Sequence, residues 1–405
     1  MLNPKKLTQL GLFVGLLLSL TSFSGKAQAY YWMVRHGYTN CANCHADPSG
    51  GSLLTAYGRA QGELLLKTHY SDKDAEDPGP GGELLFGLVD FPSSVLVGAE
   101  FRGLAYSVFP KKGSTKSDAF LMQSDALAQI RLGRFRANAS IGFAQSGASG
   151  AAITSNGGSN LVSRAHWLGL DLGSENQFLL RAGRFNLPFG IRSIEHTTFV
   201  RSITRTDINA AQNHGVALSY NDEHWRTELM ALLGNFQTRP DKFRERGYAG
   251  YLEYAWTPTL ATGLTSLTAY SALDARYQTS LLRQAHGLFV RYAPWQPLVL
   301  SVESDLLIDA IGDNQSTGSK STTQLGIANL VQADYELIQG LHFIGIGELY
   351  APSSGAGLSY SAWGGIDWFF YSHLDLRVDT VYQSYVIGAD RTHAVSLVAQ
   401  LHGYL

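Results

Sequence analysis

Residues 374–382 read Leu-Asp-Leu-Arg-Val-Asp-Thr-Val-Tyr, so apolar and charged side chains alternate along the first six positions. Successive side chains of a β-strand point to opposite faces, which places the three charged residues on one face and Leu374, Leu376 and Val378 on the other. A packed protein core does not accept unpaired charges of both signs, whereas a water-filled interior does. The stretch therefore predicts a strand of a transmembrane β-barrel, with its apolar face toward lipid and its charged face toward the lumen.

The same alternation continues over residues 84–405, where turns interrupt it repeatedly. We expect an all-β, 16-stranded antiparallel transmembrane β-barrel, because bacterial single-chain barrels have an even number of strands. The expected strands are residues 94–106, 119–131, 134–145, 161–172, 176–184, 212–221, 224–234, 246–256, 261–271, 282–292, 296–306, 325–337, 341–351, 358–370, 373–384 and 391–405. Short connections alternate with longer ones, as periplasmic turns and extracellular loops do. Because the first connection is long, the pattern predicts a periplasmic N-terminus.

The composition agrees with a barrel in the lipid of the bacterial outer membrane. Only 16% of the residues are charged, while glycine (43), tyrosine (20) and phenylalanine (19) are frequent. Trp256, Trp295 and Phe369 are among the aromatic residues near expected strand ends, where interfacial girdles lie. A soluble β-sandwich or propeller is the alternative, but no blade-like repeat is present. The formal net charge of −2 shows no basic excess, so no nucleic-acid partner is expected.

The first 29 residues have the features of a secretory signal peptide. Lys5 and Lys6 precede an apolar run over residues 10–20, and Ala27-Gln28-Ala29 is a small-x-small cleavage site. We expect the mature chain to begin near Tyr30. A transmembrane anchor is the alternative, but the run is shorter than the roughly 20 residues that span a bilayer.

The two cysteines of the chain lie in one pentapeptide, Cys41-Ala42-Asn43-Cys44-His45. This is the C-x-x-C-H signature of haem c attachment. Each thiol can add across one vinyl group of haem, and the adjacent histidine then binds the iron as proximal ligand. Export supports this interpretation, because haem c is attached on the outer side of the inner membrane. The alternative is a Cys41–Cys44 disulfide with His45 incidental.

The sequence leaves the second axial ligand of such a haem open. No methionine lies between His45 and Met122, so the usual downstream methionine of small soluble cytochromes is missing. The local candidates are His36, His69 and Met33. A second histidine would give a lower reduction potential than a methionine ligand.

Three segments follow the signal peptide. Residues 30–70 form the haem c segment, in which residues 52–67 have the apolar spacing of an amphipathic helix. Residues 71–83 are charged and then rich in proline and glycine, which predicts a linker, and the barrel follows over residues 84–405. A segment of about 40 residues cannot bury a core of its own, so the haem or the barrel mouth must cover the helix.

Two stretches resemble known families. Residues 41–51, Cys-x-x-Cys-His-x-x-Pro-x-Gly-Gly, together with Tyr57-Gly58-Arg59, resemble the N-terminal segment of single-haem outer-membrane β-barrel proteins from bacteria rich in c-type cytochromes. This resemblance implies a porin-like cytochrome and fixes no substrate. Residues 181–190, Arg-Ala-Gly-Arg-Phe-Asn-Leu-Pro-Phe-Gly, are similar to a segment of the phosphate-selective porin O/P family.

The longest expected connection, residues 185–211, is the third extracellular loop. In sixteen-stranded general porins this loop folds into the lumen and narrows it. Arg192, Arg201 and Arg205 lie in this loop, and a constriction lined by arginine would favour small anions. The alternative is a solvated charged loop outside the barrel.

No constellation of catalytic residues is present in the sequence, so we do not expect an enzyme. The first hypothesis is electron transfer at or across the outer membrane. One haem cannot bridge an apolar band of about 25 Å alone, so this function needs a partner such as a periplasmic or multihaem cytochrome. The second is a diffusion channel for small solutes, anions among them, in which the haem segment is a plug or redox sensor. A haem-stabilised anchor without transport is a third.

Overall fold

The computed structural model describes residues 30–51, 53–71, 79–143, 161–174, 177–193, 198–208, 211–238, 240–314, 316–352, 357–387 and 390–405. The expected signal peptide, residues 1–29, lies outside the described residues. Within the described part, no helix is both long enough and apolar enough to cross a membrane.

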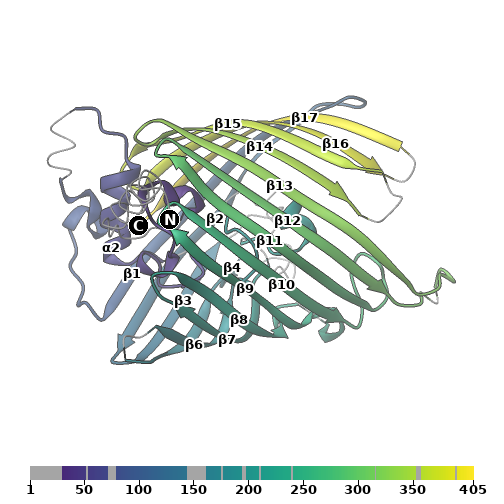
Figure 1. Ribbon diagram of the computed structural model, residues 1–405, viewed down its shortest axis with the longest axis horizontal. Coiled ribbons are helices and arrows are strands. Elements are labelled where there is room, and N and C mark those ends of the chain that lie inside the picture. Colours follow the sequence, from purple (N-terminus) through teal and green to yellow (C-terminus); the bar gives the residue numbers. More distant parts are fainter. Residues whose placement is uncertain are drawn as a thin grey trace, which may run out of the picture.

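Antiparallel strands in the described part of the chain form one closed ring, in which sequential strands pair and the last strand pairs with the first. The strands are β1 (Val95–Pro110), β2 (Lys116–Leu132), β3 (Phe135–Phe143), β4 (Leu161–Val162), β5 (His166–Leu172), β6 (Phe178–Phe185), β7 (Asn213–Asn221), β8 (Trp225–Gly234), β9 (Arg246–Thr257), β10 (Leu260–Ser271), β11 (Leu281–Trp295), β12 (Leu298–Ile311), β13 (Thr322–Ile338), β14 (Leu341–Ala351), β15 (Ser359–Tyr371), β16 (Leu374–Ile387) and β17 (Asp390–Tyr404). Both β4 and β5 pair with β3, so they are two parts of one barrel strand. The described chain thus forms a closed sixteen-stranded barrel, which confirms the predicted fold (Figure 1).

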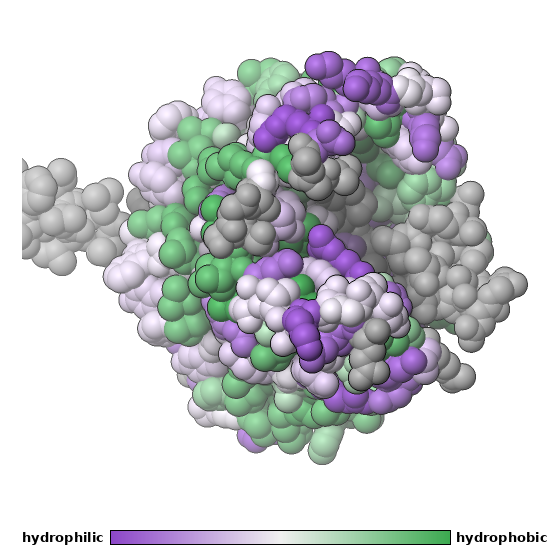
Figure 2. All heavy atoms as spheres, turned by 90° about the vertical axis from the view of Figure 1, so that its right-hand side faces the viewer, coloured by the Kyte–Doolittle hydropathy of each residue, from purple (hydrophilic) through white to green (hydrophobic). Residues whose placement is uncertain are grey.

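Short turns and longer loops alternate around the ring, as the sequence predicts. Turns of two to five residues follow β2, β5, β7, β9, β11, β13 and β15. Most connections at the other end are longer, up to residues 186–212 between β6 and β7. The C-terminus lies at the short-turn end, on the left in Figure 1. Figure 2 looks onto the long-loop end, where a hollow opens between groups of hydrophilic residues.

The two faces of the strands carry the chemistry that the alternation predicts. In β16, Asp375, Arg377 and Asp379 point into the lumen and are at most 5% exposed. Leu376 and Val378 point outward and are 37% and 38% exposed. Charged residues inside and apolar residues outside are the reverse of a soluble protein and are typical of a barrel in a membrane.

One aromatic residue departs from the predicted girdle. Trp256 and Trp295 are exposed at strand ends, as expected, but Phe369 is only 1% exposed. The strand pairing of β15 is irregular just beyond Trp368, and Phe369 packs edge-on against Tyr30 inside the barrel. A β-bulge changes the face to which the following side chain points, and simple alternation cannot predict its position.

The N-terminal segment lies inside the short-turn end of the barrel, where it is purple in Figure 1. It contains the short helices η1 (Tyr31–His36), η2 (Cys41–Asn43), α2 (Ala56–Gln61), η3 (Gly62–Leu66), η4 (Gly79–Gly82) and η5 (Leu84–Gly87). Trp32, Met33 and Val34 of η1 are at most 2% exposed and belong to one buried cluster with Val299 and Phe369 of the wall. The lumen therefore supplies the apolar cover that this short segment lacks by itself.

The helix expected over residues 52–67 begins later in the structure. Thr55 is its N-cap, because the Thr55 hydroxyl accepts a hydrogen bond from the Gly58 N–H. Leu54, one residue earlier, pairs instead with His45 in an isolated antiparallel bridge. Apolar spacing indicates which face of a helix is buried, but it does not locate the N-cap.

The linker expected over residues 71–83 is described only in part, because residues 72–78 lie outside the described residues. Its last part, η4, packs on the barrel end, where the Gly81 carbonyl oxygen lies 2.5 Å from Nε2 of His373. Residues 79–82 are therefore part of the packed N-terminal segment.

The long connection between β6 and β7 also folds into the lumen. It contains α5 (Phe199–Ile203), whose first N–H donates to the lumen-facing carboxylate of Glu348. The Ile191 N–H donates to Glu303 of β12 at 2.9 Å. Phe189 and Val200 are buried together with apolar wall residues. This loop and the N-terminal segment therefore fill much of the interior that the sequence suggested would hold water.

Candidate functional site

The pentapeptide Cys41–His45 forms one tight turn. The N–H groups of Cys44 and His45 both donate to the Cys41 carbonyl, at 3.2 and 3.1 Å. The Asn40 side chain caps the turn by accepting a hydrogen bond from the Ala42 N–H at 3.0 Å. Residues at positions i, i+3 and i+4 lie on one side of a helical turn. Cys41, Cys44 and His45 are therefore on the same side, which attachment of one cofactor by all three requires. We call this element the Cys–His turn.

A second turn fixes the ring of His45. The Asp47 carboxylate accepts hydrogen bonds from the Ser49 N–H (2.9 Å) and the Ser49 hydroxyl (2.6 Å). Gly50 and Gly51 follow with φ angles of 85° and 87°, which glycine adopts readily. The Gly51 carbonyl oxygen lies 2.9 Å from Nδ1 of His45. Metal-binding histidines are usually held in this way, by a hydrogen bond at one ring nitrogen while the other binds the metal.

Helix α2 packs directly on the Cys–His turn at Gly58. A Cβ atom at this position would lie 2.4 Å from the Cys44 carbonyl oxygen. The next residue, Arg59, donates to the Val97 carbonyl of β1 at 3.0 Å. The residues that carry the resemblance to single-haem barrels thus have local roles: the glycines shape the turn, Gly58 admits the helix and Arg59 fastens it to the wall.

We expect Gly58→Ala to lower the haem content of the purified protein severalfold, because the new Cβ would push α2 away from Cys44. The measurement is haem c per protein from the pyridine haemochrome spectrum. Gly345→Ala is the matched control, since a Cβ at Gly345 in β14 would meet no atom within 4 Å. Equal haem content in the two variants would contradict the close approach at Gly58.

Charged residues of the lumen wall hold the Cys–His turn and the turn that follows it. Arg181 of β6 binds Asp47 at 2.9 Å, and Arg226 of β8 donates to Sγ of Cys41. Burial acts to raise the pKa of Asp47, but Arg181 and Arg192 outweigh it and hold this pKa below its usual value. Arg181 is the fourth residue of β6, which places the contact about 10 Å along the strand from the barrel end, at roughly 3.3 Å per residue. The site therefore lies inside the barrel, not below it.

Both cysteines are buried, and their sulfur atoms are not bonded to each other. Cys41 is 3% exposed and Cys44 is 1% exposed. Burial, followed by the proximity of Cys41, raises the pKa of the Cys44 thiol, so this thiol is neutral at pH 7. A thioether to haem is also neutral, so forming it adds no buried charge here.

A cavity of about 1260 Å³, part of it open to solvent, adjoins the Cys–His turn. Tyr31, Leu53, Leu66 and Trp167 give the cavity apolar sides. The first three come from the N-terminal segment and the last from β5, so segment and wall enclose the cavity together.

Three arginines with unused donors face the same cavity, namely Arg102, Arg164 and Arg192. Among the described residues, Nε and Nη1 of Arg102, Nε of Arg164 and Nη1 of Arg192 are buried without a hydrogen-bond partner. Haem carries two propionate carboxylates, and the planar fork of arginine matches a carboxylate. The residues present therefore fit haem c, with two thiols, a held imidazole, apolar walls and unsatisfied guanidinium groups.

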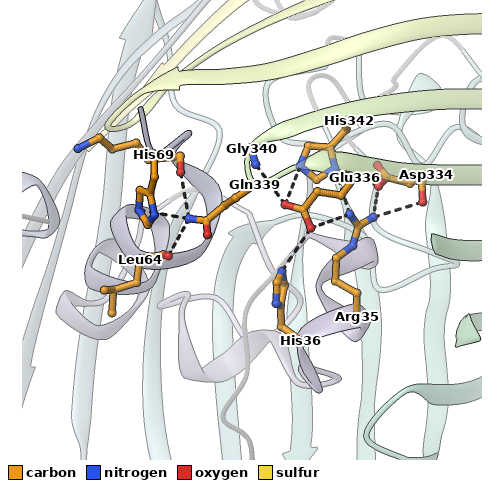
Figure 3. A network of polar contacts seen from close by, with 10 residues as sticks. Arg35, His36, Leu64, His69, Asp334, Glu336, Gln339, Gly340 and His342 are labelled. Carbon is orange, nitrogen blue, oxygen red and sulfur yellow. Dashed lines mark hydrogen bonds and ion pairs between the residues drawn. The ribbon is translucent and has the colours of Figure 1, made fainter. Parts of the chain in front are cut away.

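The structure does not bring the other candidate iron ligands to this cavity. Nε2 of His36 lies 4.0 Å from a carboxylate oxygen of Glu336, and Nε2 of His69 lies 3.3 Å from the Gln339 amide nitrogen (Figure 3). His36 thus contacts the last part of β13, and His69 contacts the turn between β13 and β14. Met33 is fully buried against the wall. None of the three lines the cavity beside the Cys–His turn.

The three arginines proposed for the constriction do not form a ring of free positive charge. Arg201 is buried and pairs with Glu303 of the wall, and Arg205 binds Asp274 at 2.6 Å. Arg192 faces the cavity of the Cys–His turn. The loop does narrow the lumen, but Arg201 and Arg205 fasten it to other elements. Selectivity for anions stays a prediction. The ion pairs of Arg201 and Arg205 do not favour it, because they neutralise the charge of these arginines.

Sequence reasoning missed three residues of the cavity: Arg102, Arg164 and His402. The alternation of side chains does predict that His402 faces the lumen, because its neighbour Leu401 is on the apolar face of the last strand. Alternation does not predict which lumen-facing residues of neighbouring strands lie at the same level along the barrel axis. That level is set by strand register, which places His402 opposite Arg102 of β1 and Asp375 of β16.

No protein-family profile matches the chain, and no curated protein matches it. Solved structures do. OmpT of Vibrio cholerae has a TM-score of 0.57 and 12% identity, over 78% of this chain and 100% of that chain. The outer membrane channel DcaP of Acinetobacter baumannii has a TM-score of 0.56 and 12% identity, over 78% and 99%. OmpF of Salmonella typhi has a TM-score of 0.51 and 13% identity, over 77% and 99%. The fold is that of outer-membrane channels. At this level of identity the likeness concerns the fold alone.

Proposed function

We propose that this protein is an outer-membrane barrel that carries one covalent haem c in its lumen and transfers electrons at or across the outer membrane. Cys41 and Cys44 would hold the haem, and His45 would be its proximal ligand. The observation that carries the proposal is the Cys–His turn enclosed by the barrel, beside a cavity with buried, unsatisfied arginine donors. When bound, haem c supplies a one-electron couple between ferric and ferrous iron.

The lengths of the connections support a periplasmic N-terminus. Short turns of outer-membrane barrels face the periplasm, and the N-terminal segment lies at the short-turn end. The proposed electron donor or acceptor on that side is a periplasmic cytochrome. Arg35 of η1 forms a buried ion pair with Asp334 of β13, which fastens the segment inside the wall. The segment is therefore held in place while a partner docks on the barrel end.

The location inside the lumen favours electron transfer over a haem that only stiffens a domain below the membrane. Arg181, which binds Asp47, is the fourth residue of β6, so the haem would sit within the lumen and not beneath the barrel. The remaining path leads past the third loop toward the hollow at the long-loop end, where a second redox partner, such as a multihaem cytochrome, would complete the transfer (Figure 2).

Because the transfer needs a redox partner on each side, the test uses the purified barrel in liposomes that enclose ferricyanide together with a multihaem cytochrome, with a reduced small c-type cytochrome outside. We expect oxidation of the external cytochrome at least tenfold faster than in liposomes with the Cys41→Ala/Cys44→Ala barrel. This control has the same barrel without thioethers, so it reports any leak of ferricyanide through the lumen. Equal rates in the two preparations would overturn the electron-transfer proposal.

The second candidate is a diffusion channel plugged by the haem segment. The likeness of the fold to solved outer-membrane channels favours it. Planar-bilayer conductance that is ion-selective and unaffected by Cys41→Ala would support the channel, whereas a closed barrel with haem-dependent electron transfer would exclude it.

A further inference from the structure

We propose that His402 of β17 is the second axial ligand of the haem, so that the barrel wall and the N-terminal segment share the iron. This inference rests on the proposed haem site and deepens it, because it names a ligand from the barrel itself. It differs from the local candidates His36 and His69, which contact Glu336 and Gln339 (Figure 3) and do not line the cavity.

His402 faces the cavity beside the Cys–His turn. It is 4% exposed and lies on the lumen face of the last strand, two residues before the strand ends. His45 lines the same cavity, and no other histidine or methionine of the described chain does. The two imidazoles therefore approach one space from two separate elements, as the axial ligands of a bis-histidine haem must.

The surroundings of the two ring nitrogens of His402 fit a metal ligand. Nδ1 lies 2.9 Å from Oδ1 of Asp375 on β16. Nε2 is buried and has no hydrogen-bond partner among the described residues. A carboxylate at one ring nitrogen fixes the ring and leaves the other nitrogen to bind the metal. His45 is held by the Gly51 carbonyl in the corresponding way.

Three charged groups face His402, namely Asp375, Glu100 and Arg102. A purely structural ion pair with Glu100 is the competing explanation, but Oε1 of Glu100 lies 3.6 Å from Nε2, beyond hydrogen-bond distance. That same carboxylate oxygen accepts a hydrogen bond from Arg102 at 2.6 Å. Glu100 thus bonds to its neighbour on β1, and at 3.6 Å it leaves Nε2 of His402 without a hydrogen bond.

Tyrosines also line the cavity, including Tyr31 and Tyr404. Tyrosine binds iron as the phenolate, which requires loss of a proton in a buried place. Neutral imidazole binds without that cost, so histidine is the better ligand here. Two histidines also predict a lower reduction potential than a histidine–methionine pair.

Ligation by His402 would join the cofactor to the seam of the barrel. β17 pairs with both β16 and β1, so it closes the ring. An iron held by both His45 and His402 would tie the N-terminal segment to this closing strand. Haem attachment and barrel closure would then stabilise each other.

The test is the spin state of the iron in purified, haem-containing protein. Ferric wild type should give the low-spin electron paramagnetic resonance signal of bis-histidine haem, and the ferrous form should not bind carbon monoxide. His402→Ala should lose the low-spin signal, bind carbon monoxide, and regain the low-spin signal with added imidazole. His36→Ala and His69→Ala are the matched controls and should keep the wild-type spectra.

A second variant guards against misfolding of His402→Ala. His402→Met offers a thioether ligand and should remain low-spin with a more positive midpoint potential. Folding of each variant is checked by its heat-dependent migration on gels. A folded His402→Ala protein that stays low-spin, with a folded His402→Met protein of unchanged potential, would overturn the role of His402. Absence of covalent haem in the wild type would instead overturn the proposed function.

Discussion

Replacing both thiols, with Cys41→Ala and Cys44→Ala in one chain, is expected to abolish covalent haem while the barrel still folds. No other cysteine is present in the sequence, so no thioether can form elsewhere. The barrel is held by the continuous pairing of its strands, which the two small substitutions leave intact. The measurement is a reduced-minus-oxidised absorption spectrum after acid–acetone extraction of loose haem. The c-type α-band should be absent, and heat-dependent migration on gels should match that of the wild type.

Asn43→Ala is the matched control for the double variant. Asn43 is exposed in the same pentapeptide, and its replacement keeps the C-x-x-C-H spacing. This protein should keep the α-band at wild-type intensity. A c-type band that survives in the double variant would contradict attachment at these cysteines. No band in the wild type would leave the Cys41–Cys44 disulfide as the explanation of the motif.

The barrel could be predicted from the sequence because its determinants are local. Alternation along a strand decides which side chains face lipid, and it needs no knowledge of the partner strand. β16 shows this, since Asp375 and Arg377 are buried and Leu376 is exposed, as the sequence alone predicts. Local irregularities escaped the same reasoning. Phe369 turns inward next to a bulge, and residues 163–165 interrupt the strand that contains β4 and β5.

The site could be predicted only as far as its local part. The C-x-x-C-H spacing located Cys41, Cys44 and His45, and the structure brings them to one side of a turn. The contacts that place this turn join residues far apart in sequence, such as Asp47 with Arg181. Such pairs depend on strand register and on how the segment enters the barrel. His402 was missed for the same reason, although its place on the lumen face follows from alternation.

The second large effect is expected at Glu303, the wall carboxylate that holds the third loop. It pairs with Arg201 and accepts the Ile191 N–H at 2.9 Å. The side chains of Arg201 and Glu303 are 3% and 1% exposed, so Glu303→Ala would leave a buried guanidinium without its carboxylate. Breaking a buried pair in this way costs about 3–5 kcal/mol. We expect the free energy of unfolding to fall by that amount. The measurement is a urea titration in lipid vesicles.

Asp241→Ala is the matched control, because it removes an ion pair that is exposed instead of buried. Asp241 binds Arg244 at 2.8 Å, but the aspartate side chain is 60% exposed. Exposed pairs contribute roughly 0–1 kcal/mol, so this variant should stay close to the wild type. Equal stability of the Asp241→Ala and Glu303→Ala proteins, with unchanged conductance in both, would show that the buried pair does not hold the loop.

Replacing both Arg201 and Glu303 by apolar residues separates the effect of an unpaired buried charge from the effect of lost packing. The double variant Arg201→Met/Glu303→Leu removes both charges of this pair, and apolar replacements of buried pairs are often neutral or stabilising. It should therefore recover most of the stability that Glu303→Ala loses. If the loop of Glu303→Ala leaves the lumen instead of unfolding the barrel, single-channel conductance should rise in that variant and fall back in the double variant. Phe189 and Val200 favour this recovery, because they bury the loop against the wall without any charge.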